Sequence, residues 1–222
     1  MKTITVDMAR SIWLFNVVEI NPSGMSLNRV MSAITSRYGF KKFPENYTDA
    51  MEQQKGLVFQ EGEFTTADGR TIGISVSVFN DGLVADSRSS TNDSDAFLRD
   101  LTAWLKEEHR LSIPEEQAIR IGHLSQLTVS TERGLGSLNS RLTDFAKYLT
   151  SKTEMLDRKP RQINVSGIAF WAEDIGKPGA PAAFRFEHKW KTSLSEKRYF
   201  SQAPLATEAH KEALDKFEEI MS

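Results

Sequence analysis

Glu187 and Lys189 lie two residues apart in the segment FRFEHKWK, residues 184–191. Successive side chains of a β-strand point to opposite faces, so on a strand these two residues would share one face. Carboxylate oxygens bind hard cations such as Mg²⁺, and a lysine beside the metal can support an attacking water molecule. The pair is therefore compatible with metal-dependent hydrolysis of a phosphodiester bond.

A second carboxylate for such a metal site would come from Asp174, or from its neighbour Glu173. A loop rich in glycine and proline separates these acids from the Glu-x-Lys segment, so a hairpin could bring them together. The arrangement resembles that of PD-(D/E)xK nucleases, which carry an aspartate near the end of one strand and Glu-x-Lys on the next. The resemblance implies Asp174, Glu187 and Lys189 as catalytic residues and Mg²⁺ as cofactor. It is incomplete because no proline precedes Asp174.

The same segment also has the pattern of an ordinary amphipathic strand. Aromatic residues or histidine alternate with charged residues, in the order Phe184, Arg185, Phe186, Glu187, His188, Lys189, Trp190 and Lys191. Such alternation is typical of an antiparallel strand with one face on the core and the other in water. Because a charged strand face produces Glu-x-Lys readily, the pattern favours a half-buried strand at 184–191 over a catalytic one.

A turn with two glycines, TERGLGSL at residues 131–138, is a candidate anion site. It would join a strand to a helix, and free backbone amides at the start of a helix attract phosphate or carboxylate groups. The residues involved would be Arg133, Gly134, Gly136 and Ser137. In a simpler interpretation the glycines form the turn and Ser137 caps the helix, because no complete phosphate-binding motif is present.

A group of basic residues is a candidate surface for nucleic acid. Aromatic residues are interleaved with them, and cations combined with aromatic rings can track and stack a single strand. Glu187 and Glu196 interrupt the group, and the formal net charge of −2 provides no general attraction to nucleic acid. The candidate residues are Arg185, Lys189, Lys191, Lys197 and Arg198.

The composition excludes several other kinds of site. The chain of 222 residues contains no cysteine, which excludes disulfides, thiolate zinc sites and cysteine nucleophiles. Its four histidines lack the spacing of a metal site, so we expect no metal outside the nuclease alternative and no other cofactor. No stretch approaches the ~20 apolar residues of a membrane-spanning helix. We therefore expect a cytoplasmic protein that does not enter a membrane.

The order of periodic segments predicts an α+β fold. Turn signals such as Asp68-Gly69 indicate hairpins, which favour an antiparallel or mixed sheet with helices packed on it. We expect a single compact domain, 1–222, with two βαββα-like halves at 1–110 and 111–222. Strands are expected near 11–20, 57–65, 71–80, 83–87, 123–130, 162–172 and 184–191, and helices near 26–39, 95–109, 137–151 and 207–221.

The leading functional hypothesis is a non-catalytic interaction protein, a subunit of a homo- or hetero-complex. No catalytic set of residues stands out, and the segment SIWLFNVVEI, residues 11–20, is apolar on both alternating faces. The chain also has four tryptophans, a residue type enriched where protein surfaces bury each other. The contact with a second copy or a protein partner would use a sheet edge or strand 11–20. Nucleic-acid binding and metal-dependent nuclease activity are the alternatives.

Overall fold

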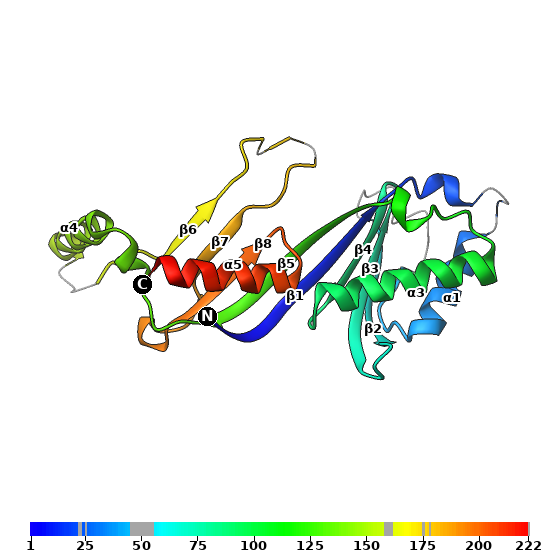
Figure 1. Ribbon diagram of the computed structural model, residues 1–222, viewed down its shortest axis with the longest axis horizontal. Coiled ribbons are helices and arrows are strands. Elements are labelled where there is room, and N and C mark those ends of the chain that lie inside the picture. The colour runs from blue at the N-terminus through cyan, green and yellow to red at the C-terminus, as the bar shows by residue number, and fades with distance from the viewer. Residues whose placement is uncertain are drawn as a thin grey trace. The chain divides into compact units, whose positions relative to one another are not determined.

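The computed structural model describes residues 1–21, 24, 26–44, 56–157, 162–174, 176–177 and 179–221. Within these residues, four α-helices pack on an antiparallel sheet of eight strands, so the predicted α+β fold class is confirmed (Figure 1). The helices of the described part are too short or too polar to cross a membrane. The strands are β1 (Lys2–Leu14), β2 (Leu57–Thr65), β3 (Thr71–Phe79), β4 (Gly82–Ser87), β5 (Arg120–Ser130), β6 (Gly167–Phe170), β7 (Phe184–His188) and β8 (Arg198–Ala203). The helices are α1 (Leu27–Tyr38), α3 (Thr91–His109), α4 (Ser140–Asp157) and α5 (Thr207–Ile220).

The strands follow the order β2-β3-β4-β1-β5-β8-β7-β6 across the sheet. The chain divides into two compact units. The N-terminal unit comprises Val6–Ser125 and Leu205–Thr207, and the C-terminal unit comprises Met1–Thr5, Gln126–Pro204 and Glu208–Ser222. Along the chain, the described elements run twice through the order β-α-β-β-β-α, which is one strand more per half than the βαββα expectation. A single folding domain and an internal duplication stay predictions.

The N-terminal unit places α1 and α3 on one face of β2, β3 and β4 (Figure 1). Strand alternation puts Ile74 and Val76 of β3 in the core, while their neighbours reach the opposite face. Helix α3 begins after Ser90, whose hydroxyl accepts a hydrogen bond from the Asp93 N–H. Helix α1 ends at Gly39, which adopts the left-handed conformation with φ 63°. These local signals fix both helices so that their apolar faces meet the sheet.

The C-terminal unit packs α5 on one face of β7 and β8. Phe186 of β7 is fully buried, stacks on Tyr199 of β8 and meets Phe217 of α5 edge-on, with ring centroids 4.7 and 5.2 Å away. His210 of α5 is also fully buried and shares a 2.8 Å hydrogen bond with the Ser201 hydroxyl. The charged residues of β7 lie on the other face, so the half-buried strand predicted from alternation is confirmed for residues 184–188.

The strand predicted at 11–20 is confirmed only for residues 11–14. The strand runs from Lys2 to Leu14, lies inside the sheet between β4 and β5, and is followed by a 3-10 turn at Val18–Ile20. The Asn16 side chain explains the break: its carbonyl accepts a hydrogen bond from the Val18 N–H, and its amide donates to Glu19. Such side-chain bonds to nearby residues favour a turn over a strand. This strand therefore offers no free edge for a partner.

Two further boundaries differ from expectation. The strand expected at 184–191 ends at His188, because Lys191 adopts a left-handed conformation with φ 64° and turns the chain. Trp190 is consequently 84% exposed instead of facing the core. The helix expected from Ser137 begins at Ser140, after a 3-10 turn at Leu135–Leu138. Segment 198–203 is strand β8.

Candidate assembly edge

Strand β6 forms one edge of the sheet and pairs with β7 alone among the described strands. The His188 N–H donates to the Ser166 carbonyl at 2.7 Å, and the register places Ile168 opposite Phe186. In an antiparallel pair, successive residues direct their backbone groups to opposite sides. Ser166 and Ile168 therefore face β7, whereas Gly167 and Ala169 direct their N–H and C=O groups outward. The outer side of β6 is thus a free hydrogen-bonding edge in the described structure.

The side chains around this edge are apolar and exposed. Phe170 is 59% and Trp171 is 54% exposed. Phe170 packs against Phe184 at 5.8 Å between ring centroids, and the Arg185 guanidinium lies 5.4 Å from the centre of the Trp171 ring. Residues 162–172 contain no charged side chain, in a chain in which 26% of residues are charged. An edge of this kind lacks the charges and prolines that commonly prevent strand pairing.

The other edge strand, β2, is protected by contrast. Its register with β3 shifts between Phe59 and Gly62, and Glu61 within this irregularity has a φ of 58°. Lys42 bridges to Gln60 on β2 and forms an ion pair with Glu61 at 2.6 Å. A bulge, two charges and a covering segment are typical devices against edge-to-edge pairing. Of the two edges, β6 is the one left open.

The three proposed nuclease residues do not meet at one point of this hairpin. Glu187 lies opposite Gly167, and Phe184 lies opposite Phe170 at the other end of the four-residue pairing. Asp174 follows Phe170 in the chain, so it leaves the hairpin at the end away from Glu187. The Lys189 amine donates to the Thr128 hydroxyl. Among the described residues, no cluster of three or more acids and histidines could hold a metal ion.

The predicted nucleic-acid residues are dispersed, and several have acidic partners. Lys197 pairs with Glu132, and Arg198 approaches Glu196 at 3.6 Å. Arg185 lies over Trp171 on the exposed sheet face, and Lys191 lies in the turn after β7. These five candidate residues therefore contribute one cation–aromatic pair, Arg185 with Trp171, rather than a continuous basic track.

The predicted anion residues form a turn that is bonded within itself. The Ser137 hydroxyl donates to the carbonyls of Gly134 and Met221, and Thr143 donates to the Gly136 carbonyl. The cap of α4 is Asn139, whose side chain accepts the Arg141 N–H at 3.0 Å. Gly134 and Gly136 border a depression of about 400 Å³ that Lys147 and Lys197 also line, whereas Arg133 is not among its lining residues.

A buried polar group that sequence reasoning missed lies in the N-terminal unit. One oxygen of Asp95 accepts hydrogen bonds from the Ser11 hydroxyl and, at 3.1 Å, from the Trp13 indole; the other lies 2.8 Å from His123 Nε2. Burial raises the pKa of Asp95, but the bonds from His123, Ser11 and Trp13 together hold it below its ordinary value. We call these four residues the Asp95 network.

The Asp95 network has the geometry of a structural element. The carboxylate stands between serine and histidine, so the Ser11 hydroxyl faces the carboxylate and not the imidazole, unlike in a Ser-His-Asp triad. Asp95 is 28 or more residues away from each partner along the chain, and no local motif could have indicated the contact.

Comparison of the chain with protein-family models, with curated proteins and with solved structures gives no match.

Proposed function

We propose that the protein is a non-catalytic assembly protein whose copies join by antiparallel pairing of their β6 strands. The observation that carries the proposal is the open, uncharged edge of β6, next to two exposed aromatic side chains. Such an edge can extend its sheet by main-chain hydrogen bonds to another strand. Assembly thereby covers an edge that would otherwise remain exposed to non-specific pairing.

A second copy fits this edge through its register. Antiparallel pairing about a two-fold axis at Ala169 sets this residue against itself and sets Gly167 against Trp171 of the other copy. These residues carry the outward backbone groups, so each pair can exchange two hydrogen bonds. On the opposite face, Ile168 meets Phe170 of the other copy, an apolar pair of the kind that stabilises sheets.

Gly167 and the lack of charged residues at 162–172 also support a second copy of the chain as the partner. A Cβ at Gly167 would lie 2.8 Å from Cβ of Glu187, so the position accepts no side chain and leaves room for a facing indole. At a two-fold axis a residue faces its own copy, and residues near the axis lie close to theirs, so any charge there would lie close to a like charge, which is destabilising on neighbouring strands. The uncharged run at 162–172 avoids this repulsion.

The test is a proline at position 169. Ala169→Pro removes an outward N–H that β7 does not use, and proline is tolerated on an edge strand. Ala169→Ser is the matched control, because it keeps the N–H and a small side chain. In sedimentation velocity, we expect wild type and Ala169→Ser to dimerise with rising concentration and Ala169→Pro to stay monomeric, with unchanged circular dichroism.

The proposal fails if the wild type stays monomeric at the highest attainable concentration, or if Ala169→Pro dimerises as strongly as the control. The nucleic-acid and nuclease hypotheses stay predictions. Neither has a comparable observation in its favour, because the basic residues are dispersed and Asp174 leaves the hairpin at the end away from Glu187.

A further inference from the structure

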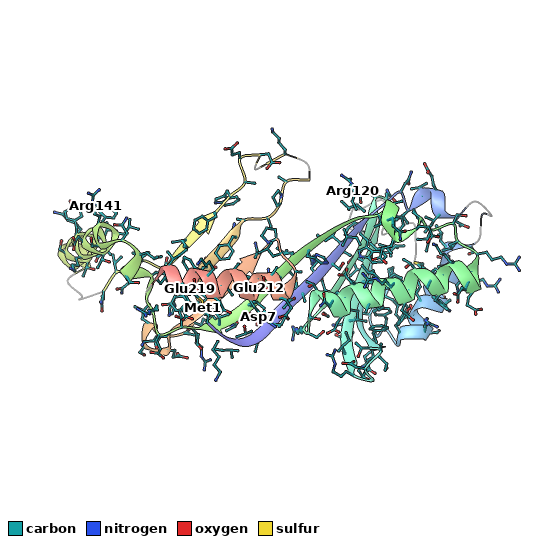
Figure 2. The ribbon with its side chains drawn as sticks, viewed as in Figure 1. Met1, Asp7, Arg120, Arg141, Glu212 and Glu219 are labelled. Atoms are coloured by element: carbon teal, nitrogen blue, oxygen red, sulfur yellow. The ribbon has the colours of Figure 1, made fainter. Side chains whose placement is uncertain are left out.

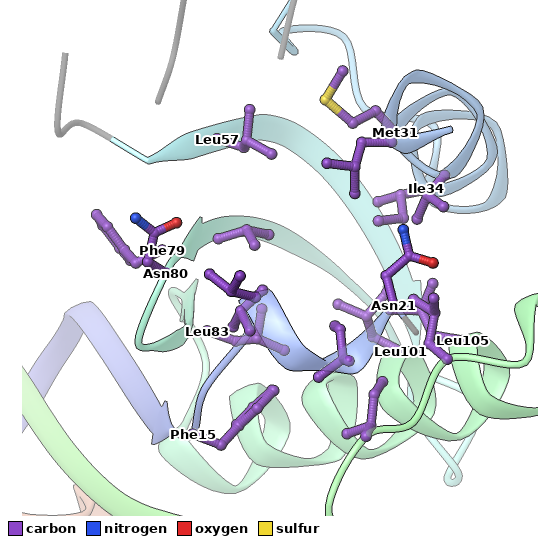
Figure 3. Close-up of a pocket in the computed structure, with 18 of the residues that line it drawn as sticks. Phe15, Asn21, Met31, Ile34, Leu57, Phe79, Asn80, Leu83, Leu101 and Leu105 are labelled. Carbon is purple, nitrogen blue, oxygen red and sulfur yellow. The ribbon is translucent and has the colours of Figure 1, made fainter. Parts of the chain in front are cut away.

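The N-terminal unit contains an apolar cavity of about 240 Å³ between the sheet and helices α1 and α3. Figure 3 shows side chains such as Ile34 of α1, Leu83 of β4 and Leu101 of α3 around this space. Of the described residues that line it, all are apolar except Asn21 and Asn80, and none is charged. Protein interiors are close-packed, and few domains keep voids larger than a water molecule. A cavity of this size therefore has room for a ligand.

The cavity adjoins an open depression at the surface of the same unit. Phe15, Val18 and Asn80 line both spaces, and Val18 is 68% exposed. The depression has a volume of about 440 Å³ and also includes Asp81 and Arg120. A molecule with an apolar part and a polar part could thus occupy both spaces at once, with its polar part at the depression.

Among its described residues, the depression contains one cation and one anion, which do not pair with each other. Arg120 is the first residue of β5 and is drawn in Figure 2, and Asp81 follows the end of β3. Among the described residues, neither side chain has an ion-pair or hydrogen-bond partner. Glu19 is turned to Asn16, which also lines the depression, by a 2.6 Å hydrogen bond. Both side chains are exposed, so a head group with both a negative and a positive charge could pair with Arg120 and Asp81 together.

We infer that the N-terminal unit binds a single-chain zwitterionic amphiphile. Its aliphatic tail fills the apolar cavity, its anionic group meets Arg120 and its cationic group meets Asp81. An apolar cavity of about 150 Å³ holds one benzene molecule, so 240 Å³ accommodates a tail of about ten carbon atoms. This inference does not depend on assembly through β6, since the two sites belong to different units.

The tail is tested with hexyl-, octyl- and decylphosphocholine, each below its micelle concentration, by isothermal titration calorimetry on the full chain. Each methylene that enters the cavity should tighten binding about fourfold. Val30→Phe, on the α1 wall of the cavity, should weaken decylphosphocholine binding at least tenfold. Val58→Phe is the matched control, because Val58 is exposed and does not line the cavity. Affinity that is independent of tail length, or equal losses in both variants, would overturn the tail site.

The head group is tested with three ligands of the same tail length: decylphosphocholine, decanoate and decyltrimethylammonium. The wild type should bind decylphosphocholine tightest. Arg120→Gln should weaken binding of decanoate about tenfold and leave decyltrimethylammonium unchanged, and Asp81→Asn should do the reverse. These exposed substitutions leave the core intact, so they decide the question even where Val30→Phe does not fold. Equal affinity for all three ligands, or no change of preference in either variant, would overturn the zwitterionic assignment.

Discussion

Replacing Asp95 by alanine should destabilise the protein by about 3–5 kcal/mol. The substitution leaves the Ser11 hydroxyl and the Trp13 indole N–H without an acceptor, and both residues are 1% exposed or less. Each buried donor that loses its partner costs about 1–3 kcal/mol. His123 contributes less to the loss, because 24% of its side chain is exposed and water can replace the carboxylate.

Asparagine at position 95 provides the comparison. Its carbonyl oxygen can still accept from Ser11 and Trp13, and its amide can donate to a neutral His123, so the loss should be about 1–2 kcal/mol. The free energies of unfolding are measured by urea titration followed by circular dichroism, and they are compared where the dependence on urea concentration is the same for all variants. If the alanine and asparagine variants are equally stable, the hydrogen bonds of the network do not carry the stability assigned to them.

The Asp95 network predicts that the free energy of unfolding depends on pH. The pKa of Asp95 lies below its ordinary value of 3.8 in the folded chain, so the unfolded state takes up the proton first as the pH falls. The stabilisation is therefore present above about pH 4 and disappears as the pH falls through the folded pKa. The stability gap between wild type and Asp95→Asn should narrow over that range. A gap that widens toward acid would contradict the assignment.

Two further substitutions test other parts of the fold. Burial lowers the pKa of His210 to about 4, so acidification from about pH 6.5 to 4 protonates this histidine first in the unfolded chain and should remove about 3 kcal/mol of stability. The urea midpoint of wild type should therefore fall over this pH range, and that of His210→Gln should not. An equal fall in both proteins would refute the assignment. Gly82→Ala should destabilise the protein by about 3 kcal/mol, because its Cβ would lie 2.2 Å from the Trp13 carbonyl oxygen. Gly73→Ala, with open space around its Cβ, should leave stability unchanged when both variants are compared by thermal unfolding. Equal losses in the two variants would contradict the packing argument.

Much of the sheet could be predicted from periodicity. The Asp68-Gly69 turn and the alternation around it located β2 and β3 to within a residue or two, because one side of this sheet is buried and the pattern has period two. The start of β1 was missed because residues 2–10 are largely exposed or half-buried and five of these nine residues are polar. Its end was missed because the bonds of the Asn16 side chain override the apolar pattern that continues to Ile20.

The candidate edge could be predicted in part. The absence of charge at 162–172 and the hairpin to residue 184 are visible in the sequence. The position of β6 at the edge of the sheet is not visible in the sequence, because strand order depends on contacts between distant segments. The face of Trp190 was mispredicted for a local reason: the left-handed turn at Lys191 ends the alternation after His188. The cavity could not be predicted either, because its walls come from segments of the N-terminal unit that are distant in the sequence.

Cross-linking of a single cysteine at position 169 tests the proposed pairing of β6 strands most directly. The chain contains no cysteine, and two facing residues of a hydrogen-bonded antiparallel pair have Cα atoms about 5.5 Å apart, within the range of a disulfide. Under mild oxidation, Ala169→Cys should form a covalent dimer on a non-reducing gel, whereas Ala182→Cys, at an exposed position outside the edge, should remain monomeric. Equal cross-linking of the two variants, or a monomeric Ala169→Cys, would contradict assembly through this strand.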